Sequence, residues 1–369
     1  MAWKPWWPRE TISLFSSRIL FIPVEMRILM VGHYPPHGGG VATHLDNLVR
    51  ELRVRHEVHV LTYGPVKARK GEERLVHQVN VPPVYGLRGT AFAFLGARKI
   101  INLDSLYDFD IVHAHFVGTT SYAAALAKVK IQKPLVLTAH GSDLQHTASL
   151  TLGRFYVMKS LEAADRVITV SHELAKTAAR LGARNINVIP NGIKNLGNKI
   201  SQGSGEYITF IGALREYKSP ETFIELARHF PDREFLIVGD GPLKKELERI
   251  APDNVRFFGY RSDVGNVLSR TVLLVLPSQR EGFGMVILEA NSFGVPVVGR
   301  AVGGVPELIR NGKNGLLFRT FDELLDAVNV LLEPKTNRRT GVTGRGVVKS
   351  YSWTKVAFSV ERIYRELVG

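Results

Sequence analysis

Short buried strands alternate with amphipathic helices through most of this chain. The first unit is the apolar run Arg27 to Gly32, followed by Val41 to Val54, where Leu45, Leu48 and Leu52 share one helix face. Strands that alternate with helices pair in parallel, because each crossover helix returns the chain to the same edge of the sheet. The sequence therefore predicts an α/β fold with parallel sheets that are covered on both faces.

The same pattern predicts elements in two series. In the first series the further strands are His56 to Thr62, Ile111 to Ala114, Leu135 to Thr138, Arg166 to Val170 and Asn187 to Pro190, and the further helices are Tyr122 to Lys130 and His172 to Leu181. In the second series the strands are Tyr207 to Gly212, Phe235 to Gly239, Val255 to Phe258, Val272 to Pro277 and Val295 to Gly299, and the helices are Pro220 to His229, Leu243 to Ile250, Met285 to Phe293 and Phe321 to Leu332. A basic segment that contains Gly, Glu333 to Gly346, predicts an exposed connection, and a final amphipathic helix is expected from about Trp353 to Val368.

A polar segment separates the two series. Residues 193–205, IKNLGNKISQGSG, are rich in Gly, Asn and Ser, a composition typical of a linker. A chain of 369 residues suits two domains of ordinary size. We therefore expect an N-terminal domain at 26–192 and a C-terminal domain at 206–352, each doubly wound.

The first 25 residues differ from the rest of the chain, because Trp3, Trp6 and Trp7 are three of its four tryptophans. Trp and basic residues favour a membrane interface, so one hypothesis is an interfacial anchor. We favour an N-terminal extension that is disordered or lies upstream of the true start, since Met26 directly precedes the first predicted strand. No segment approaches the ~20 apolar residues of a membrane-spanning helix. The expected location is cytoplasmic, with peripheral attachment to the inner membrane face as an alternative.

Charge and cysteine content narrow the classes of partner. Lys and Arg number 48 against 34 for Asp and Glu, so the formal net charge is +14. A chain this basic attracts anionic partners, among which nucleic acid, an anionic membrane and phosphorylated small molecules all remain open. The chain has no cysteine, which excludes disulfides and thiolate metal sites.

The segment PSQREGFGMVILEA, residues 277–290, carries the strongest chemical signal. Two glycines flank Phe283 between a predicted buried strand and a helix that starts near Met285. The free N–H groups of a helix start attract phosphate, and glycines let a ligand approach the backbone closely. Glu281 precedes this helix and is placed to meet a sugar, whereas Glu289 lies in its first turns and is placed to accept hydrogen bonds from ribose hydroxyls. Stabilisation of acidic residues by the helix dipole would explain a Glu here, but not the Gly-Phe-Gly turn after a buried strand.

This segment resembles the retaining glycosyltransferases of family 4, whose hallmark is a Glu, seven residues and a second Glu, here EGFGMVILE. The similarity covers nearly everything from Met26 onward. It implies the GT-B fold, an α/β architecture of two Rossmann-like doubly wound domains that face each other across a cleft. It also implies metal-independent transfer of a hexose, without a cofactor, from a UDP-, GDP- or ADP-sugar to a lipid, glycan or polysaccharide acceptor. In the family the last helix crosses back to the N-terminal domain, so residues 353–369 are expected to complete that domain.

The resemblance places the donor on the C-terminal domain. It assigns donor binding to Gly212, Arg215, Lys218, Gly241, Gly282, Phe283, Gly284, Met285, Val286 and Glu289. In FIGALREYKSPE, Lys218 stands at a family Lys that clamps the diphosphate. The usual family Arg falls on Ala213, and Arg215 is the candidate substitute. The need for charge is physical, because a leaving diphosphate without a metal requires cations or amide groups. On residues alone, a solvated helix cap remains the competing interpretation of these basic side chains.

Two segments of the N-terminal domain carry the other half of the resemblance. In HYPPHGGGVATH, Gly38, Gly39 and Gly40 correspond to a glycine-rich loop whose N–H groups reach a phosphate or a sugar. In TAHGSDL, His140 corresponds to a family His that meets the donor sugar, so His140 and Glu281 are the candidate catalytic residues. Without the family, the first segment is equally an ordinary strand-to-helix turn and the second a His satisfied within a loop.

The strand DIVHAHF raises the question of a metal, because His113 and His115 lie on one strand face. No third ligand stands nearby in sequence, and the family needs no metal. We therefore expect no metal site.

Three other functions would each need a particular feature of the sequence or fold. A dinucleotide-dependent dehydrogenase would need the spacing G-x-G-x-x-G after the first strand, which HYPPHGGGVATH lacks. A nucleic-acid-binding protein would need a surface of interleaved aromatic and basic residues, which is absent outside the N-terminal extension, so no nucleic-acid partner is expected. A phosphorylase or an epimerase stays open, because such enzymes share the two-domain fold.

Overall fold

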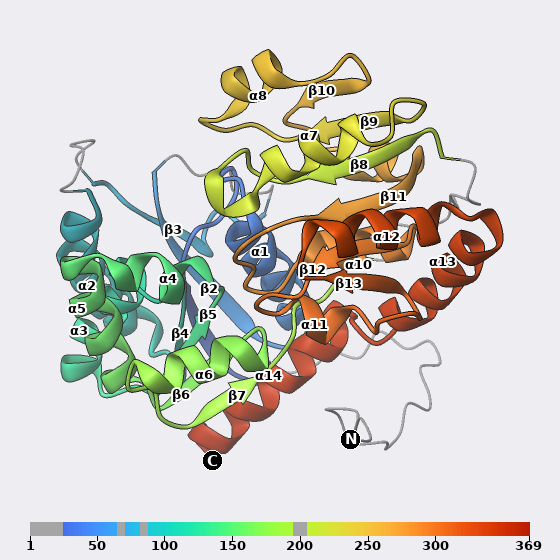
Figure 1. The fold of residues 1–369 in the computed structure, drawn as a ribbon. Coiled ribbons are helices and arrows are strands. Elements are labelled where there is room, and N and C mark those ends of the chain that lie inside the picture. Colours follow the sequence, from blue (N-terminus) through green and yellow to red (C-terminus); the bar gives the residue numbers. More distant parts are fainter. Residues whose placement is uncertain (1–24, 65–70, 82–87, 195–204) are drawn as a thin grey trace, which may run out of the picture.

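The computed structural model describes residues 25–64, 71–81, 88–194 and 205–369. The chain forms two halves, each a parallel sheet flanked by helices on both faces (Figure 1). Nearly all of the predicted N-terminal extension and most of the predicted linker at 193–205 lie outside the described residues, so those two predictions stay open. That the two halves are independent domains, 26–192 and 206–352, also remains a prediction.

Each half has a single parallel sheet with the strand order of a doubly wound fold. The N-terminal sheet has the order β3-β2-β1-β4-β5-β6-β7, and the C-terminal sheet has the order β10-β9-β8-β11-β12-β13. The strands of the first sheet are β1 (Arg27–Val31), β2 (Glu57–Tyr63), β3 (Val76–Val79), β4 (Ile111–His115), β5 (Leu135–Ala139), β6 (Arg166–Thr169) and β7 (Ile186–Val188). Those of the second are β8 (Tyr207–Ile211), β9 (Glu234–Val238), β10 (Val255–Gly259), β11 (Thr271–Leu276), β12 (Val297–Arg300) and β13 (Gly315–Phe318). The predicted fold class is confirmed.

Helices connect the strands. The N-terminal half contains α1 (Gly40–Leu52), α2 (Arg88–Tyr107), α3 (Thr119–Ile131), α4 (Ser142–Gln145), α5 (Thr151–Ala163) and α6 (His172–Arg180). The C-terminal half contains α7 (Pro220–Arg228), α8 (Lys244–Ile250), α9 (Val264–Leu268), α10 (Met285–Ser292), α11 (Val305–Leu308), α12 (Phe321–Leu332) and α13 (Pro334–Val348), and α14 (Trp353–Val368) ends the chain. Among the described helices, none is both long enough and apolar enough to cross a membrane.

The prediction of an exposed connection at Glu333 to Gly346 is wrong, because this segment lies within helix α13. The Glu333 side chain caps the helix by accepting hydrogen bonds from the N–H groups of its first turn, where Pro334 follows. The glycines serve close packing rather than flexibility. A Cβ at Gly344 would come within 2.9 Å of the Asn291 side chain on α10, and one at Gly341 would overlap the carbonyl oxygen of Gly294.

Alternate residues of the strands point to two different cores, as the pleat requires. In β1, Leu29 and Val31 join the core beneath α2 and α3, whereas Ile28 and Met30 join the core beneath α1 and α14. In the C-terminal half, α7 and α12 cover one face of the second sheet. Because both sheets are buried on both faces, ligands reach them only at the strand ends.

The last helix belongs to the N-terminal half by packing, as Figure 1 shows with α14 (red) returning beneath the first sheet. Trp353 begins α14 and closes against Gly192, where a Cβ would meet the indole ring at 2.7 Å. The two passages of the chain between the halves lie side by side, since the Ile193 N–H donates to the Tyr351 carbonyl at 2.8 Å. At the far end of α14, the Tyr364 hydroxyl lies 2.6 Å from Nδ1 of His113 in β4. The chain thus leaves the N-terminal half and returns to it at neighbouring positions.

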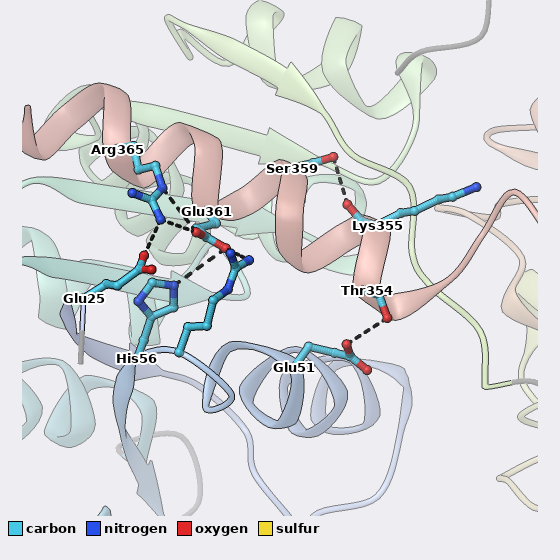
Figure 2. A network of polar contacts seen from close by, with 9 residues as sticks. Glu25, Glu51, His56, Thr354, Lys355, Ser359, Glu361 and Arg365 are labelled. Carbon is cyan, nitrogen blue, oxygen red and sulfur yellow. Dashed lines mark hydrogen bonds and ion pairs between the residues drawn. The ribbon is translucent and has the colours of Figure 1, made fainter. Parts of the chain in front are cut away.

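A polar network fastens α14 to the N-terminal half (Figure 2). Its centre is Glu361, which is only 3% exposed and forms ion pairs with Arg55 and Arg365. The Nε2 atom of His56 lies 3.7 Å from the same carboxylate. Nearer the start of the helix, Thr354 donates a hydrogen bond to Glu51. Two guanidinium groups therefore balance one buried carboxylate at this interface.

Replacing Glu361 with glutamine is expected to lower the free energy of unfolding by about 2 kcal/mol, because Arg55 loses its buried counter-charge and Arg365 keeps only its ion pair with Glu25. Glu366→Gln is the matched control on the same helix. Glu366 is half exposed and lies 3.8 Å from Arg166, so its loss should change stability by less than about 0.5 kcal/mol. Denaturant unfolding of both variants measures the difference. Equal effects of the two substitutions would show that the network adds nothing to the docking of α14.

Candidate active site

The carboxyl ends of the central strands of both sheets meet at a cavity of ≈ 810 Å³ between the halves. The N-terminal half contributes residues that follow β1, β5 and β7, namely Gly40, Val41, His140, Ser142, Gln145, His146 and Asn191. The C-terminal half contributes residues that follow β8, β9 and β11, namely Ile211, Arg215, Glu216, Tyr217, Lys218, Pro242, Leu243, Arg280, Glu281, Gly282, Phe283, Gly284, Met285, Val286 and Glu289. This volume suits a nucleotide-sized ligand.

The first turn of α10 forms part of the cavity wall. Gly284 precedes the helix with φ 94°, a left-handed conformation that favours glycine, and Met285 and Val286 follow it along the wall. Phe283 is buried and points its ring toward Tyr351, at a centroid distance of 6.3 Å. The first N–H groups of a helix have no partner within the helix, so this turn offers donors to an anion in the cavity.

Glu289 lies one turn further along α10 and also lines the cavity. Its carboxylate is partly exposed to the cavity and has no hydrogen bond or ion pair with any described residue. Partial burial raises the pKa of this carboxyl. Its oxygens are therefore available to a ligand that carries hydroxyl groups.

Lys218 and Glu281 form an ion pair inside the cavity. The Nζ atom of Lys218 lies 2.5 Å from a carboxylate oxygen of Glu281, and both side chains are mostly buried. Lys218 ends a short 3-10 turn, Glu216–Lys218, that follows β8, and the Tyr217 ring lies 5.7 Å from its ammonium group. Sequence reasoning gave these two residues separate partners on the donor, whereas the fold holds them together as an ion pair.

Two arginines add positive charge to the same wall. Arg215 is exposed, and its guanidinium group has no hydrogen bond or ion pair within the described ranges. Arg280 lies 6.0 Å from the Tyr217 ring centroid, and sequence reasoning did not single it out. Its position directly before Glu281 was the signal that could have revealed it. The cavity wall therefore carries basic side chains, although Ala213 stands at the position of the usual family Arg.

Backbones approach each other closely around Glu281. A Cβ at Gly282 would come within 2.5 Å of the carbonyl oxygen of His140, so the two halves touch at glycine. The Ser171 hydroxyl also donates to the Gly282 carbonyl at 2.8 Å. On the other side, Gly303 packs directly on the backbone of Glu281. The loop that carries Glu281 is therefore held between the N-terminal half and the loop after β12.

Gly303→Ala is expected to lower both stability and sugar transfer strongly. Gly303 has φ 54°, and a Cβ there would overlap the carbonyl oxygen of Glu281, which would displace the Glu281 loop. Gly312→Ala is the matched control, because Gly312 also has a positive φ, of 77°, but open space around its Cβ position. The control should show only backbone strain, of about 1 kcal/mol. Thermal unfolding and initial rates distinguish the two. Equal losses in both variants would mean that the contact with Glu281 has no role.

Some residues predicted for the site lie outside the cavity wall. Gly40 lines the cavity, but Gly38 and Gly39 do not, and nothing lies within 4 Å of their Cβ positions. Gly212 and Gly241 are also absent from the wall, where their neighbours Ile211, Pro242 and Leu243 stand instead. Gly241 packs on the backbone of Leu214. Direct contact of these four glycines with a substrate stays a prediction.

Glu307, in α11, bonds to the start of α6. It accepts hydrogen bonds from the N–H groups of His172 and Glu173, at 3.0 and 3.2 Å. An acidic side chain at a helix N-terminus is stabilised by the helix dipole. Glu307 therefore joins the two halves beside the cavity.

His140 belongs to a cluster of imidazoles that the sequence did not reveal. His44 from α1 and His115 from the end of β4 contact it, and the rings of His44 and His140 lie 4.7 Å apart. Burial lowers the pKa of His44 to about 4 and the pKa values of His115 and His140 well below the ordinary value, so all three are neutral near pH 7. His113 faces the other way and is satisfied by Tyr364 and Thr138.

Two doubly wound parallel sheets that close on a cavity lined by a free helix start and carboxylates define the class of GT-B glycosyltransferases. Comparison with known proteins agrees with this class. Residues 38–194 match the sequence profile of Glycosyltransferase Family 4, and residues 196–345 match that of Glycosyl transferases group 1. An uncharacterized glycosyltransferase of Methanocaldococcus jannaschii is 30% identical over 354 residues, which cover 93% of this chain and 99% of that protein. The chain belongs to glycosyltransferase family 4.

Two further relatives extend the comparison. The N-acetyl-alpha-D-glucosaminyl L-malate synthase of Bacillus anthracis is 28% identical over 368 residues, which cover 91% of this chain and 96% of that protein. The crystal structure of Anabaena Alr3699/HepE in complex with UDP and glucose has the same fold, with a TM-score of 0.75 at 20% identity, over 93% of this chain and 100% of that chain. The protein is thus a glycosyltransferase of the GT-B type.

Proposed function

We propose that this glycosyltransferase moves a hexose from a nucleotide-diphosphate sugar to a lipid, glycan or polysaccharide acceptor, with retention of anomeric configuration and without a metal. The observation that carries the proposal is Glu289, a carboxylate in the wall of the cavity that has no partner among the described residues. Such a group suits the two vicinal hydroxyls of a ribose, which donate two hydrogen bonds to one carboxylate.

The leaving diphosphate would lie over the first turn of α10. The N–H groups that follow Gly284 and the cations of Lys218 and Arg215 would stabilise the charge that develops as the glycosidic bond breaks. The transition state at the sugar resembles an oxocarbenium ion. Glu281 and His140, which stand beside this turn, are proposed as the catalytic residues that position the sugar.

The donor assignment agrees with the relatives. The Anabaena structure of the same fold holds UDP and glucose, and the name of the Bacillus protein describes a glucosaminyl product. In this chain the acceptor would enter from the N-terminal half, near Gly40 and His140. We propose a cytoplasmic location, with peripheral attachment to the inner membrane face where the acceptor is a lipid.

A thermal-shift panel of UDP, GDP and ADP and their glucose conjugates tests the donor site. One nucleotide is expected to raise the melting temperature, since a ligand that binds only the folded state stabilises it. Release of the nucleoside diphosphate only when a glycan or lipid acceptor is present would then identify transfer. This activity should persist in excess EDTA. Release that depends on inorganic phosphate instead of an acceptor would indicate a phosphorylase. Complete loss of transfer in EDTA would overturn the metal-independent mechanism.

A further inference from the structure

Three histidines from separate elements converge at the N-terminal wall of the cavity. His44 comes from α1, His115 ends β4, and His140 follows β5. One ring nitrogen from each can be chosen so that all three lie within 4.8 Å of one another. The strand order places β4 beside β5, and α1 follows β1 on the other side of β4, so the fold brings together residues that are far apart in sequence.

One pair of these nitrogens has the spacing of two ligands on one metal ion. Nδ1 of His115 lies 3.4 Å from Nε2 of His140. With zinc–nitrogen bonds of about 2.0–2.1 Å and tetrahedral angles, two imidazoles on one Zn²⁺ have nitrogens about 3.4 Å apart. The separation is long for a hydrogen bond between the two rings. The nitrogen from His44 lies within 4.8 Å of the other two.

The surroundings prepare the imidazoles for a metal. Nδ1 of His44 lies 2.7 Å from the side-chain oxygen of Asn191, which can only accept, so Nδ1 carries the proton and Nε2 keeps its lone pair. A hydrogen bond of this kind orients ligand histidines in metal sites. Nε2 of His115 is buried and has no hydrogen-bond partner among the described residues. His113, two residues earlier, has both ring nitrogens bonded.

Neutral imidazoles are the form that binds a metal. His140 also lines the cavity, so an ion has a path from solvent. Three protein nitrogens with the fourth position open to a cavity suit Zn²⁺, for which imidazole is a preferred ligand.

We propose that His44, His115 and His140 form a site for one Zn²⁺ ion. Zinc in this site draws His140 away from the sugar that it is proposed to contact. The ion therefore inhibits transfer, a consequence that rests on the proposed function. The site is regulatory rather than catalytic, which agrees with the expectation of full activity in EDTA.

Cobalt titration of the full-length protein tests the site without any reliance on activity. The protein is first stripped with EDTA and dialysed, and Co²⁺ replaces Zn²⁺ because it reports its geometry by visible absorption. We expect one Co²⁺ per chain with the intense bands of tetrahedral coordination, which Zn²⁺ then abolishes by displacement. A wild-type protein that yields no such spectrum would overturn the proposal.

Variants assign the ligands. His115→Gln keeps the size of a fully buried side chain and is expected to weaken Co²⁺ binding at least a hundredfold. His77→Gln is the matched control, because His77 and His59 also bring ring nitrogens within 2.8 Å but belong to no three-ligand group in the described part of the chain.

If His115→Gln fails to fold by circular dichroism, Asn191→Leu serves instead. It removes only the acceptor that orients His44, and affinity should fall about 10–100-fold. Unchanged binding in the folded variants would refute the assignment.

The inhibitory consequence is measured separately. Zn²⁺ should reduce transfer with a midpoint equal to its affinity in the cobalt competition, and EDTA should restore the rate. Binding without inhibition would leave the site in place and refute its regulatory role. Absence of any transfer activity would count against the proposed function, while the cobalt spectrum would still decide on the metal site.

Discussion

Glu289→Ala is expected to abolish sugar transfer, with a fall in kcat/KM of at least a hundredfold, while the protein stays folded. Two hydrogen bonds from hydroxyls to one carboxylate are each worth about 1.5–3 kcal/mol, and 2.7 kcal/mol corresponds to about a hundredfold. The fold loses nothing, because the Glu289 carboxylate has no partner among the described residues and its burial opposes its charge. Initial rates and thermal unfolding of the same preparation measure both effects.

Glu246→Ala is the control for this substitution. Glu246 is exposed on α8 in the same half, outside the cavity wall, so its loss should leave transfer unchanged. Near-normal turnover by Glu289→Ala would remove the main support for the donor site. A collapse of stability in that variant would assign Glu289 a structural role instead.

The raised pKa of Glu289 adds a pH dependence. Burial favours the protonated form, so the carboxylate that accepts hydrogen bonds is lost at a higher pH than for an exposed glutamate. The KM for the donor should therefore begin to rise, as pH falls, before an ordinary glutamate would titrate. Glu289→Gln should show no such rise. Ionisation of a paired carboxylate stabilises a fold, whereas ionisation of Glu289 destabilises this one. Glu289→Gln should therefore unfold at a higher temperature at neutral pH.

Lys218→Met is expected to lower kcat by about 10²–10³, the effect of removing one preorganised group that stabilises charge in a transition state. Methionine keeps the length of the side chain and removes its charge. Lys244→Met is the control, because Lys244 lies on α8 outside the cavity wall and is partly exposed. Its kcat should stay within twofold of the wild-type value.

The ion pair with Glu281 allows a sharper version of this test. Lys218→Met leaves the mostly buried Glu281 carboxylate without its partner, so this variant should also be less stable. Adding Glu281→Gln should restore stability without restoring transfer. Recovery of transfer in the double variant would show that Lys218 serves only to neutralise Glu281. A wild-type kcat in the single variant would contradict its role toward the leaving group.

The sequence predicted the alternating elements well, because buried parallel strands and amphipathic helices leave periodic patterns. It missed α2, where apolar residues such as Phe94 and Leu95 are exposed and blur the helical pattern. It also missed α5 and the short edge strands β3 and β13. The error at α13 has a different origin, since Gly341 and Gly344 resemble loop residues until the contact with α10 explains them.

The sequence also predicted only part of the candidate site. Residues that follow each other in the chain, from Glu281 to Glu289, were predicted together and lie together on the cavity wall. Groupings that depend on the tertiary fold were not predicted. The meeting of His44, His115 and His140 requires α1, β4 and β5 to be neighbours, and no spacing in the sequence encodes that. The pairing of Lys218 with Glu281 likewise depends on β8 lying beside β11.

The return of α14 to the N-terminal half has a consequence for biosynthesis. Trp353, Val356 and Val360 complete a core whose other members come mainly from the first two hundred residues. During translation the strands and helices of the C-terminal half emerge in one run and can pack as they appear. The N-terminal half, although made before the C-terminal half, keeps an apolar groove open until α14 has left the ribosome. A nascent chain that lacks α14 therefore exposes apolar surface to chaperones and proteases at the half that was synthesised earlier, and truncation before α14 would destabilise that half.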